Sequence, residues 1–265
     1  MKTGRAENTT LRIAVMLGPG GASRYLLDRL EPILVSGRDI ELQGVFLEEA
    51  GVQQAAELPF VQELCRVTFA VREFDSSQFE HTLALRMRTA RQAIGVLADH
   101  AKVPFTFRNA RGSALGLLKE AVSGADVTVF EPARPPMSAA LSGPSTSKHR
   151  QRTAAVICDT DSARAVLDTA LKFAGGTLDR LSILLFPSAG QDIDTLRTLY
   201  REHLPGQPGH VRLITEGDFK NLAITNRTLL TSMLVAPAND LMTSDRSLQF
   251  LLAQVRCPVC LVGRY

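Results

Sequence analysis

The sequence predicts an α/β fold made of two parallel-sheet domains in tandem. One observation is a repeat, because the segment RIAVMLGPGGASRYLLD at 12–28 aligns without a gap with RTAAVICDTDSARAVLD at 152–168. Each copy runs from an apolar stretch through a turn of small residues into a helical pattern. A second observation is that strand and helix patterns alternate along both copies with short connections. This alternation specifies right-handed crossovers and a parallel sheet that is covered on both faces.

Composition and charge are those of an ordinary globular protein. The 265 residues suffice for two domains, and 45% are hydrophobic and 22% charged. Thirty basic residues are interleaved with 27 acidic ones, which argues against a large nucleic-acid-binding patch. We expect no membrane span and a cytoplasmic location, because the chain has no sufficiently long apolar run and no recognisable signal peptide.

Four strands are expected in the first copy, at 11–17, 40–49, 104–110 and 126–132. The clearest helix follows a capping box that starts at Ser77 and ends at Glu80, and its apolar spacing continues to Ala101. Residues 50–74 are ambiguous, since parts of them fit short helical turns and parts alternate like a strand.

The second copy repeats this pattern and adds a further helix and strand. Its strands are expected at 153–159, 180–188, 210–216, 231–237 and 258–263. The alignment offset between the copies falls from 140 to 105 at Gly112 and Gly217, so the first copy carries 35 additional residues between its second and third strands. Insertions in a connection are tolerated better than insertions within a strand.

These patterns predict a domain organisation. It comprises a polar tail at 1–10, a first domain at 11–134 with an insertion at 50–85, a linker at 135–151 and a second domain at 152–265. The linker is rich in Pro, Ser and Gly. The first domain is expected to lack the last helix and strand of the second.

Three features together resemble the universal stress protein family. They are the strand–Asp–small turn–helix opening of the second copy, a G-x-x-x-x-[LI] helix start before the fourth strand of each copy, and the terminal CPVCLV at 257–262. The resemblance covers nearly the whole chain twice over, as in tandem members. It implies a Rossmann-like, adenine nucleotide alpha hydrolase-like sheet in each copy, with any ligand at the carboxyl ends of the strands.

The nucleotide-binding branch of that family has an Asp after the first strand and a glycine loop, G-x2-G-x9-G-[ST], after the fourth. The acid is matched by Asp159 in the second copy, whereas Pro19 stands in its place in the first. The glycine loop has no counterpart, because 236–239 reads Ala-Pro-Ala-Asn, and Asp240 and Asp245 follow. We therefore expect ATP binding to be weakened or absent in both copies, and no cofactor to be required.

The candidate ligand contacts lie at the two strand–helix turns and the loop after 231–237: Gly18, Gly20, Gly21, Ser23, Asp159, Ala236 and Asn239. The turn at 18–23 fits an anion cradle at a helix N-terminus, or simply a tight turn followed by a helix cap. Asp159 likewise fits either a ribose contact or a helix cap.

Five arginines, Arg86, Arg88, Arg91, Arg108 and Arg111, lie close together in the sequence. They fit a solvated helix face or a site that gathers an anion.

No catalytic or metal-binding set is recognisable. Cys257 and Cys260 have the spacing of a redox pair or a zinc half-site, but they lead into an apolar strand and have no second pair, so we interpret them as core residues. The five histidines show no metal-ligand spacing.

The sequence leaves three hypotheses. The first is a non-enzymatic universal-stress-type protein that acts in a stress response or in regulation through a protein partner or a small ligand. The second is an ATP-using ligase or hydrolase on the related fold, which is expected to place charge-stabilising groups where this chain has Pro, Ala and acids. In the third, the insertion builds a pocket for a non-nucleotide ligand.

A homodimer is also predicted. Only the second copy has a last strand, so residues 258–263 are expected to present an unpaired edge, which soluble proteins rarely leave bare. We expect two copies of the chain to pair through that strand with C2 symmetry.

Overall fold

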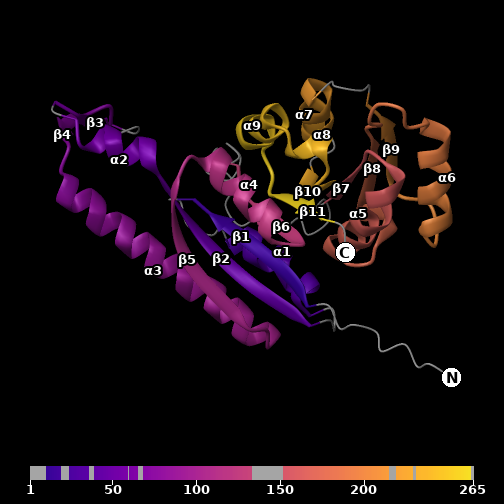
Figure 1. The fold of residues 1–265 in the computed structure, drawn as a ribbon, viewed down its shortest axis with the longest axis horizontal. Coiled ribbons are helices and arrows are strands. Elements are labelled where there is room, and N and C mark those ends of the chain that lie inside the picture. The colour runs from indigo at the N-terminus through magenta and orange to yellow at the C-terminus, as the bar shows by residue number, and fades with distance from the viewer. Residues whose placement is uncertain are drawn as a thin grey trace.

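A nine-stranded sheet runs through the molecule (Figure 1). The computed structural model describes residues 10–18, 24–35, 39–58, 60–64, 68–132, 152–214, 219–228 and 231–263. In spatial order the strands are β5 (Phe105–Gly112), β2 (Ile40–Glu49), β1 (Leu11–Leu17), β6 (Val127–Phe130), β11 (Val259–Val262), β10 (Thr231–Pro237), β7 (Arg152–Ile157), β8 (Leu181–Leu185) and β9 (His210–Leu213). Neighbouring strands are parallel except β6 and β11, which are antiparallel.

The strand order confirms the predicted fold class. In the second half, β9, β8, β7, β10 and β11 are the third, second, first, fourth and fifth strands in chain order. In the first half, β5, β2, β1 and β6 occupy the same places up to the fourth. Among the described residues, the first half thus contributes four strands to this sheet and no fifth, as the sequence predicts.

Helices cover both faces of the sheet. One face carries α1 (Arg24–Leu34), α3 (Ser76–Ala101), α5 (Thr160–Phe173) and α6 (Ile193–His203), and the other carries α4 (Ala114–Gly124), α7 (Phe219–Thr228), α8 (Asp240–Thr243) and α9 (Asp245–Gln254). A short 3-10 helix, Leu178–Arg180, precedes β8. Side chains of each strand alternate between the two cores, so that Ile13 and Val15 pack in one and Ala14 and Met16 in the other. None of the described helices has both the length and the apolar character needed to cross a membrane.

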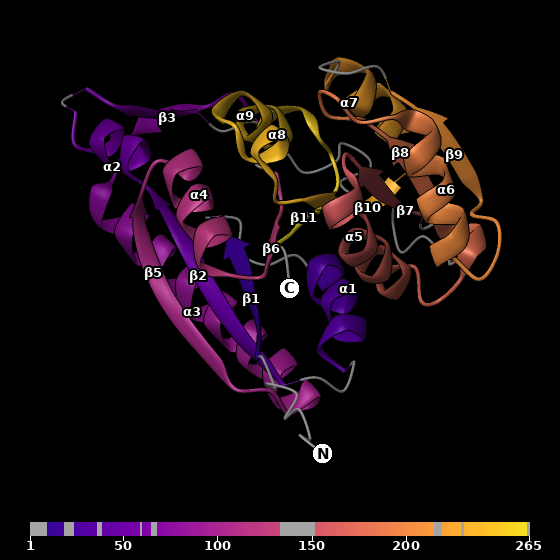
Figure 2. The same cartoon turned by 45° about the vertical axis from the view of Figure 1, so that its right-hand side comes forward.

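The two halves also contact each other through their helices. Figure 2 shows α1 of the first half beside α5 of the second. From α1, Arg29 donates one hydrogen bond to the carbonyl oxygen of Phe173 and another to Ser232 Oγ, each at 3.1 Å. On the opposite face, Lys119 of α4 forms an ion pair with Asp245 of α9. Each core cluster therefore contains residues from both halves.

The expected unpaired edge at 258–263 is wrong. Strand β11 is hydrogen-bonded on both sides, to β10 and to β6, with Val259 opposite Phe130 and Val262 opposite Val127. The physical reason is that no described strand of the first half pairs with the second side of β6, and β11 covers that side within the same chain. A homodimer through this strand therefore loses its physical basis.

The insertion of the first half forms α2 (Ala50–Ala56), β3 (Gln62–Leu64), β4 (Val71–Glu73) and the start of α3. Strands β3 and β4 pair as an antiparallel hairpin that, with α2, projects from the sheet at the left of Figure 1. The ambiguous segment thus contains both a short helix and strands. All residues of β3 and β4 are exposed, so neither strand has a buried face that would have given it a clear sequence pattern.

The long helix α3 is capped two residues before the predicted position, at Asp75 and not at Ser77. The N-cap of α3 is Asp75, whose Oδ1 accepts hydrogen bonds from the backbone N of Gln78 at 3.1 Å and from Ser77 Oγ at 2.7 Å. The rings of Phe74 and Phe79, which flank this cap, pack with centroids 5.5 Å apart. This contact is a hydrophobic staple, and it fixes the direction in which the chain enters the helix.

Two exposed helix caps are expected to make stability sensitive to acid. The pKa of Asp75 is lowered by hydrogen bonds from Ser77 and Gln78, and the pKa of Asp192, the N-cap of α6, is lowered by those from Thr195. A carboxyl whose pKa is lower in the folded state stabilises the fold above its unfolded pKa, and this contribution is lost as the pH falls through the folded pKa. We expect the urea midpoint to fall between about pH 5 and about pH 3.

The control for this acid effect is Asp75→Asn/Asp192→Asn, since Asn still caps a helix but does not titrate. The midpoint of this variant should fall less than that of the unsubstituted protein over the same pH range. An equal fall in both would contradict the assignment.

Candidate functional site

Two of the predicted site residues meet at the carboxyl ends of neighbouring strands. Asp159 follows β7, and Asn239 follows β10, which lies beside β7 in the sheet. Asn239 Nδ2 donates a hydrogen bond to Asp159 Oδ2 over 2.6 Å, although the residues are 80 positions apart in the sequence. The carboxyl ends of parallel strands are the usual ligand position in this class of sheet.

Both of these residues also cap helices. Asp159 is the N-cap of α5, and its Oδ1 accepts hydrogen bonds from the backbone N and from Oγ of Ser162, both at 2.7 Å. Asn239 is the N-cap of α8, and its Oδ1 accepts from the backbone N of Met242 at 3.0 Å. Both carboxylate oxygens of Asp159 are thus engaged within the chain.

The residues around this pair are buried or directed at the backbone. The pKa of the Cys158 thiol is strongly raised, first by burial and second by the neighbouring Asp159 carboxylate. Ser188 Oγ donates to the carbonyl oxygen of Cys158 at 3.0 Å. Ala236 lies within β10 with its side chain fully buried, so only its backbone could contact a ligand.

The segment after β10 forms two helix starts. Ser244 caps α9 through its Oγ, which accepts from the backbone N of Ser247 at 3.3 Å. Asp240 and Asp245 lie in the first turns of α8 and α9, where a carboxylate interacts favourably with the helix dipole. Each of these helix N-termini, which would otherwise attract a phosphate group, therefore already has a carboxylate beside it, and the one at α9 is paired with Lys119.

In the first half, only part of the predicted turn can be described. Gly18 directly follows β1, and apart from its chain neighbours no described residue comes within 4 Å of the position that a Cβ would occupy there. Gly20, Gly21 and Ser23 lie outside the described residues, so the anion cradle stays a prediction. Because β6 and β11 are antiparallel, β1 and β7 run in opposite directions, and their carboxyl ends lie at opposite ends of the strands of the sheet.

The structure separates the five arginines that the sequence placed together. Arg108 points to the α4 face of β5 and pairs with Glu120 at 2.9 Å. Arg88 and Arg91 of α3 instead line a cavity between that helix and β5. The strand residues of this cavity, Phe107 and Asn109, were not predicted, since no local pattern indicates which helix will cover which strand.

The cysteines agree with the interpretation as core residues. Cys158, Cys257 and Cys260 are buried free thiols, and burial strongly raises the pKa of Cys260, which lies within β11. Within the described part of the chain, no three His, Cys, Asp or Glu side chains are grouped so that they could hold a metal ion.

The comparisons with known proteins rest on structure. No protein-family model and no curated protein matches the sequence. A universal stress protein from Archaeoglobus fulgidus DSM 4304 has a similar structure, with a TM-score of 0.50, 12% identity and coverage of 95% of this chain and 96% of that one. A putative universal stress protein from Pseudomonas aeruginosa UCBPP-PA14 gives a TM-score of 0.44 at 11% identity, with 97% and 94% covered.

The match to the Archaeoglobus protein extends over nearly the full length of both chains. It agrees with the strand order of the two halves and with the motifs that resemble the family. This chain therefore has the fold of a universal stress protein.

Proposed function

We propose that the protein is a non-enzymatic stress-response or regulatory protein whose nucleotide sites have degenerated. It acts through a protein partner or a small ligand, and its place is the cytoplasm. The fold makes a stress-response type of protein the natural starting point. The residues at the carboxyl ends of the strands support the degeneration of the nucleotide sites.

The hydrogen bond between Asn239 and Asp159 carries this proposal. An acid that receives a ribose hydroxyl needs an accessible acceptor oxygen, but Asp159 Oδ2 is held at 2.6 Å by the Asn239 amide and Oδ1 is held by Ser162. A nucleotide would have to displace the amide or share the oxygen with it. Displacing the amide leaves a half-buried donor without its partner, which costs free energy.

The place of the phosphate groups gives further support. A phosphate-binding loop offers backbone N–H groups from glycines at a helix N-terminus. Here Pro237 ends β10, and the caps and acids of α8 and α9 follow directly. The carboxylate of Asp240 repels a triphosphate, whereas that of Asp245 is paired with Lys119. The residues present thus fit ATP poorly.

The hydroxyl groups at this edge favour a role without catalysis. A nucleophilic serine needs a base that takes its proton and an open path to the substrate. Ser162 is buried, and its Oγ donates to the capping oxygen of Asp159. Ser188 Oγ donates to a backbone carbonyl. Both hydroxyls therefore serve the local structure.

Calorimetric titration with magnesium ATP tests this proposal. We expect a dissociation constant weaker than about 1 mM, because the ribose contact and the phosphate loop are both compromised. Mass spectrometry of small molecules released from the purified protein should find no adenine nucleotide, and phosphate release from ATP should not exceed the rate without protein. Micromolar binding that disappears in Asp159→Ala would overturn the degenerate site.

A further inference from the structure

Helix α3 and strand β5 line a cavity of about 320 Å³ that is open to solvent on one side. This volume lies at the lower end of the range for small-molecule pockets. The cavity is lined by residues of both elements: Ala84, Met87, Arg88, Arg91, Phe107 and Asn109. It lies in the first half of the chain, whereas Asp159 and Asn239 belong to the second, so the cavity and that pair share no residues.

Two glycines set the shape of this cavity. A Cβ on Gly44 of β2 would come within 2.7 Å of the Phe107 ring, so the ring lies over the strand only because residue 44 has no side chain. Farther along α3, Gly95 allows close approach to Phe105, with 3.3 Å between its Cβ position and the ring. From there α3 diverges from the sheet toward the insertion (Figure 1), and the cavity lies in this diverging part.

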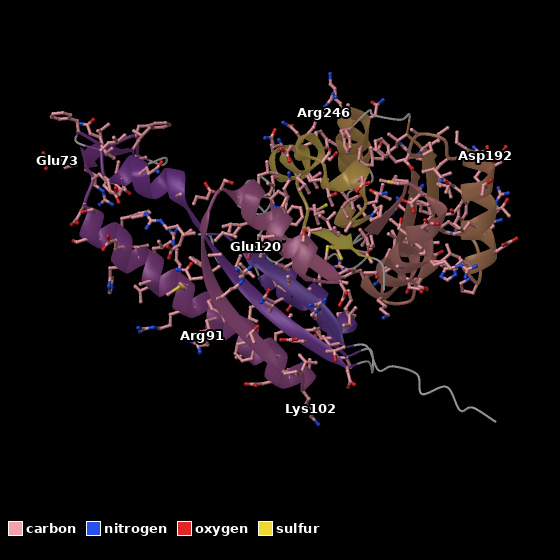
Figure 3. The ribbon with its side chains drawn as sticks, viewed as in Figure 1. Glu73, Arg91, Lys102, Glu120, Asp192 and Arg246 are labelled. Carbon is pink, nitrogen blue, oxygen red and sulfur yellow. The ribbon has the colours of Figure 1, made fainter. Side chains whose placement is uncertain are left out.

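Two arginines of the cavity lack a partner in the described part of the chain. The side chains of Arg88 and Arg91 form no ion pair or hydrogen bond with any described residue, in contrast to Arg108, which pairs with Glu120. Arg91 is seen on the flank of α3 in Figure 3. The two arginines are three positions apart, so they neighbour each other on one helix face, where like charges repel. A bound anion would relieve this repulsion.

The strand side adds polar and apolar groups. Asn109 Nδ2 donates a hydrogen bond to Glu48 Oε1 of β2, so the Asn109 side chain holds this carboxylate. Arg111 lies two positions farther along β5 and therefore on the same face of the strand as Asn109. Phe107 and Met87 supply an apolar surface. The described residues that line the cavity thus include two arginines and no carboxylate, and the arginines lie beside a surface suited to a flat or apolar group.

We propose that this cavity binds a small organic anion. The carboxylate or phosphate group of the ligand pairs with Arg88 and Arg91, and its apolar body packs against Phe107 and Met87. Guanidinium groups bind both kinds of anion through charge-assisted, bidentate hydrogen bonds. This site goes beyond the proposed function, because it requires neither a nucleotide nor the edge of the sheet at Asp159.

Benzoate and phenyl phosphate are suitable probes, and ligand-observed NMR or calorimetry measures their binding to the full chain. We expect Arg88→Gln/Arg91→Gln to weaken binding of at least one probe by about tenfold or more, because two charge-assisted contacts are lost. The matched control is Arg164→Gln/Arg256→Gln. It removes the same charge from exposed arginines that likewise have no partner in the described residues, and it should leave binding within about twofold.

A second arm tests the apolar contact. Acetate and inorganic phosphate should bind more weakly than benzoate and phenyl phosphate, and Gly44→Ala should weaken binding of the aromatic probes because the new methyl group displaces the Phe107 ring. Circular dichroism checks that each variant is folded. If Gly44→Ala does not fold, the test of the site rests on Arg88→Gln/Arg91→Gln.

Three outcomes overturn the site: neither aromatic probe binds at about 10 mM, the control variant weakens binding as much as the cavity variant, or inorganic phosphate binds as well as phenyl phosphate. None of them bears on the titration with ATP.

Discussion

Replacing Leu261 by alanine is expected to lower the free energy of unfolding by about 2–5 kcal/mol. Leu261 is 1% exposed and lies in β11, the strand that joins the two halves of the sheet. Its neighbours across the strands are Ala236 of β10 and Thr128 of β6. Truncation leaves a cavity between elements that belong to both halves, and urea denaturation followed by circular dichroism measures the loss.

Leu213→Ala is the matched control, because it makes the same substitution in the same sheet. Leu213 lies in β9, at the outer edge, and its side chain is 50% exposed. Less apolar area is buried there, so we expect a loss below about 1 kcal/mol. If the two variants lose equal stability, β11 does not have the central place that its pairing with β6 implies.

Replacing Asp159 by alanine is the second prediction with a large effect, and we expect it to destabilise the protein by about 2 kcal/mol or more. The substitution removes the acceptor that caps α5 and also the partner of the Asn239 amide. Asn239 is itself the cap of α8, so two helix starts lose support together. Thermal and urea unfolding measure the effect.

The control is Asp192→Ala at the start of α6. Asp192 Oδ2 accepts from the backbone N and from Oγ1 of Thr195, both at 2.9 Å, which reproduces the contacts of Asp159 with Ser162. The contact with Asn239 distinguishes the two caps, so Asp192→Ala should destabilise less. A double-mutant cycle of Asp159→Ala and Asn239→Ala should give a coupling of about 1 kcal/mol. Equal losses at the two caps, with no coupling, would show that the Asp159–Asn239 contact adds nothing to the fold.

This stability prediction and the proposed function are connected. A residue kept for a nucleotide is commonly retained at some cost to stability, whereas a residue that holds two helix starts contributes to the fold. A large stability loss in Asp159→Ala together with unchanged weak binding of ATP supports a structural role. Unchanged stability together with lost ATP binding supports a ligand contact.

Sequence patterns predicted most of the elements because the buried strands of a parallel sheet are apolar on both faces. Strands β1 and β7 appear as apolar runs, and Asp159 after β7 is the N-cap of α5. The start of α3 was displaced because Asp75 and Ser77 both have side chains that can cap a helix. Competition between such neighbours is decided by the entry direction that Phe74 and Phe79 set.

The candidate site was predictable only in part. Asp159 and Asn239 were candidates because each follows a strand, and the order of the strands then brings them together. The cavity beneath α3 was not predictable, since Phe107 and Arg88 have no pattern that links them across elements. The five arginines that lie close together in the sequence partly indicated this site. Their spacing did not show that Arg108 faces α4 while Arg88 and Arg91 line the cavity.

The sequence alone determined that the chain contains two copies of one strand order, that the first copy lacks its last strand, and that the second keeps an acid without a glycine loop. Tertiary structure decided that β11 pairs with β6 and that the Asn239 amide donates to the Asp159 carboxylate. It also decided that Arg88 and Arg91 line a cavity. The physical reason is the separation along the chain between the interacting residues. Local patterns report which backbone conformation and which buried face a segment prefers, whereas the partner of a strand edge or a carboxylate is set by elements far away in the chain.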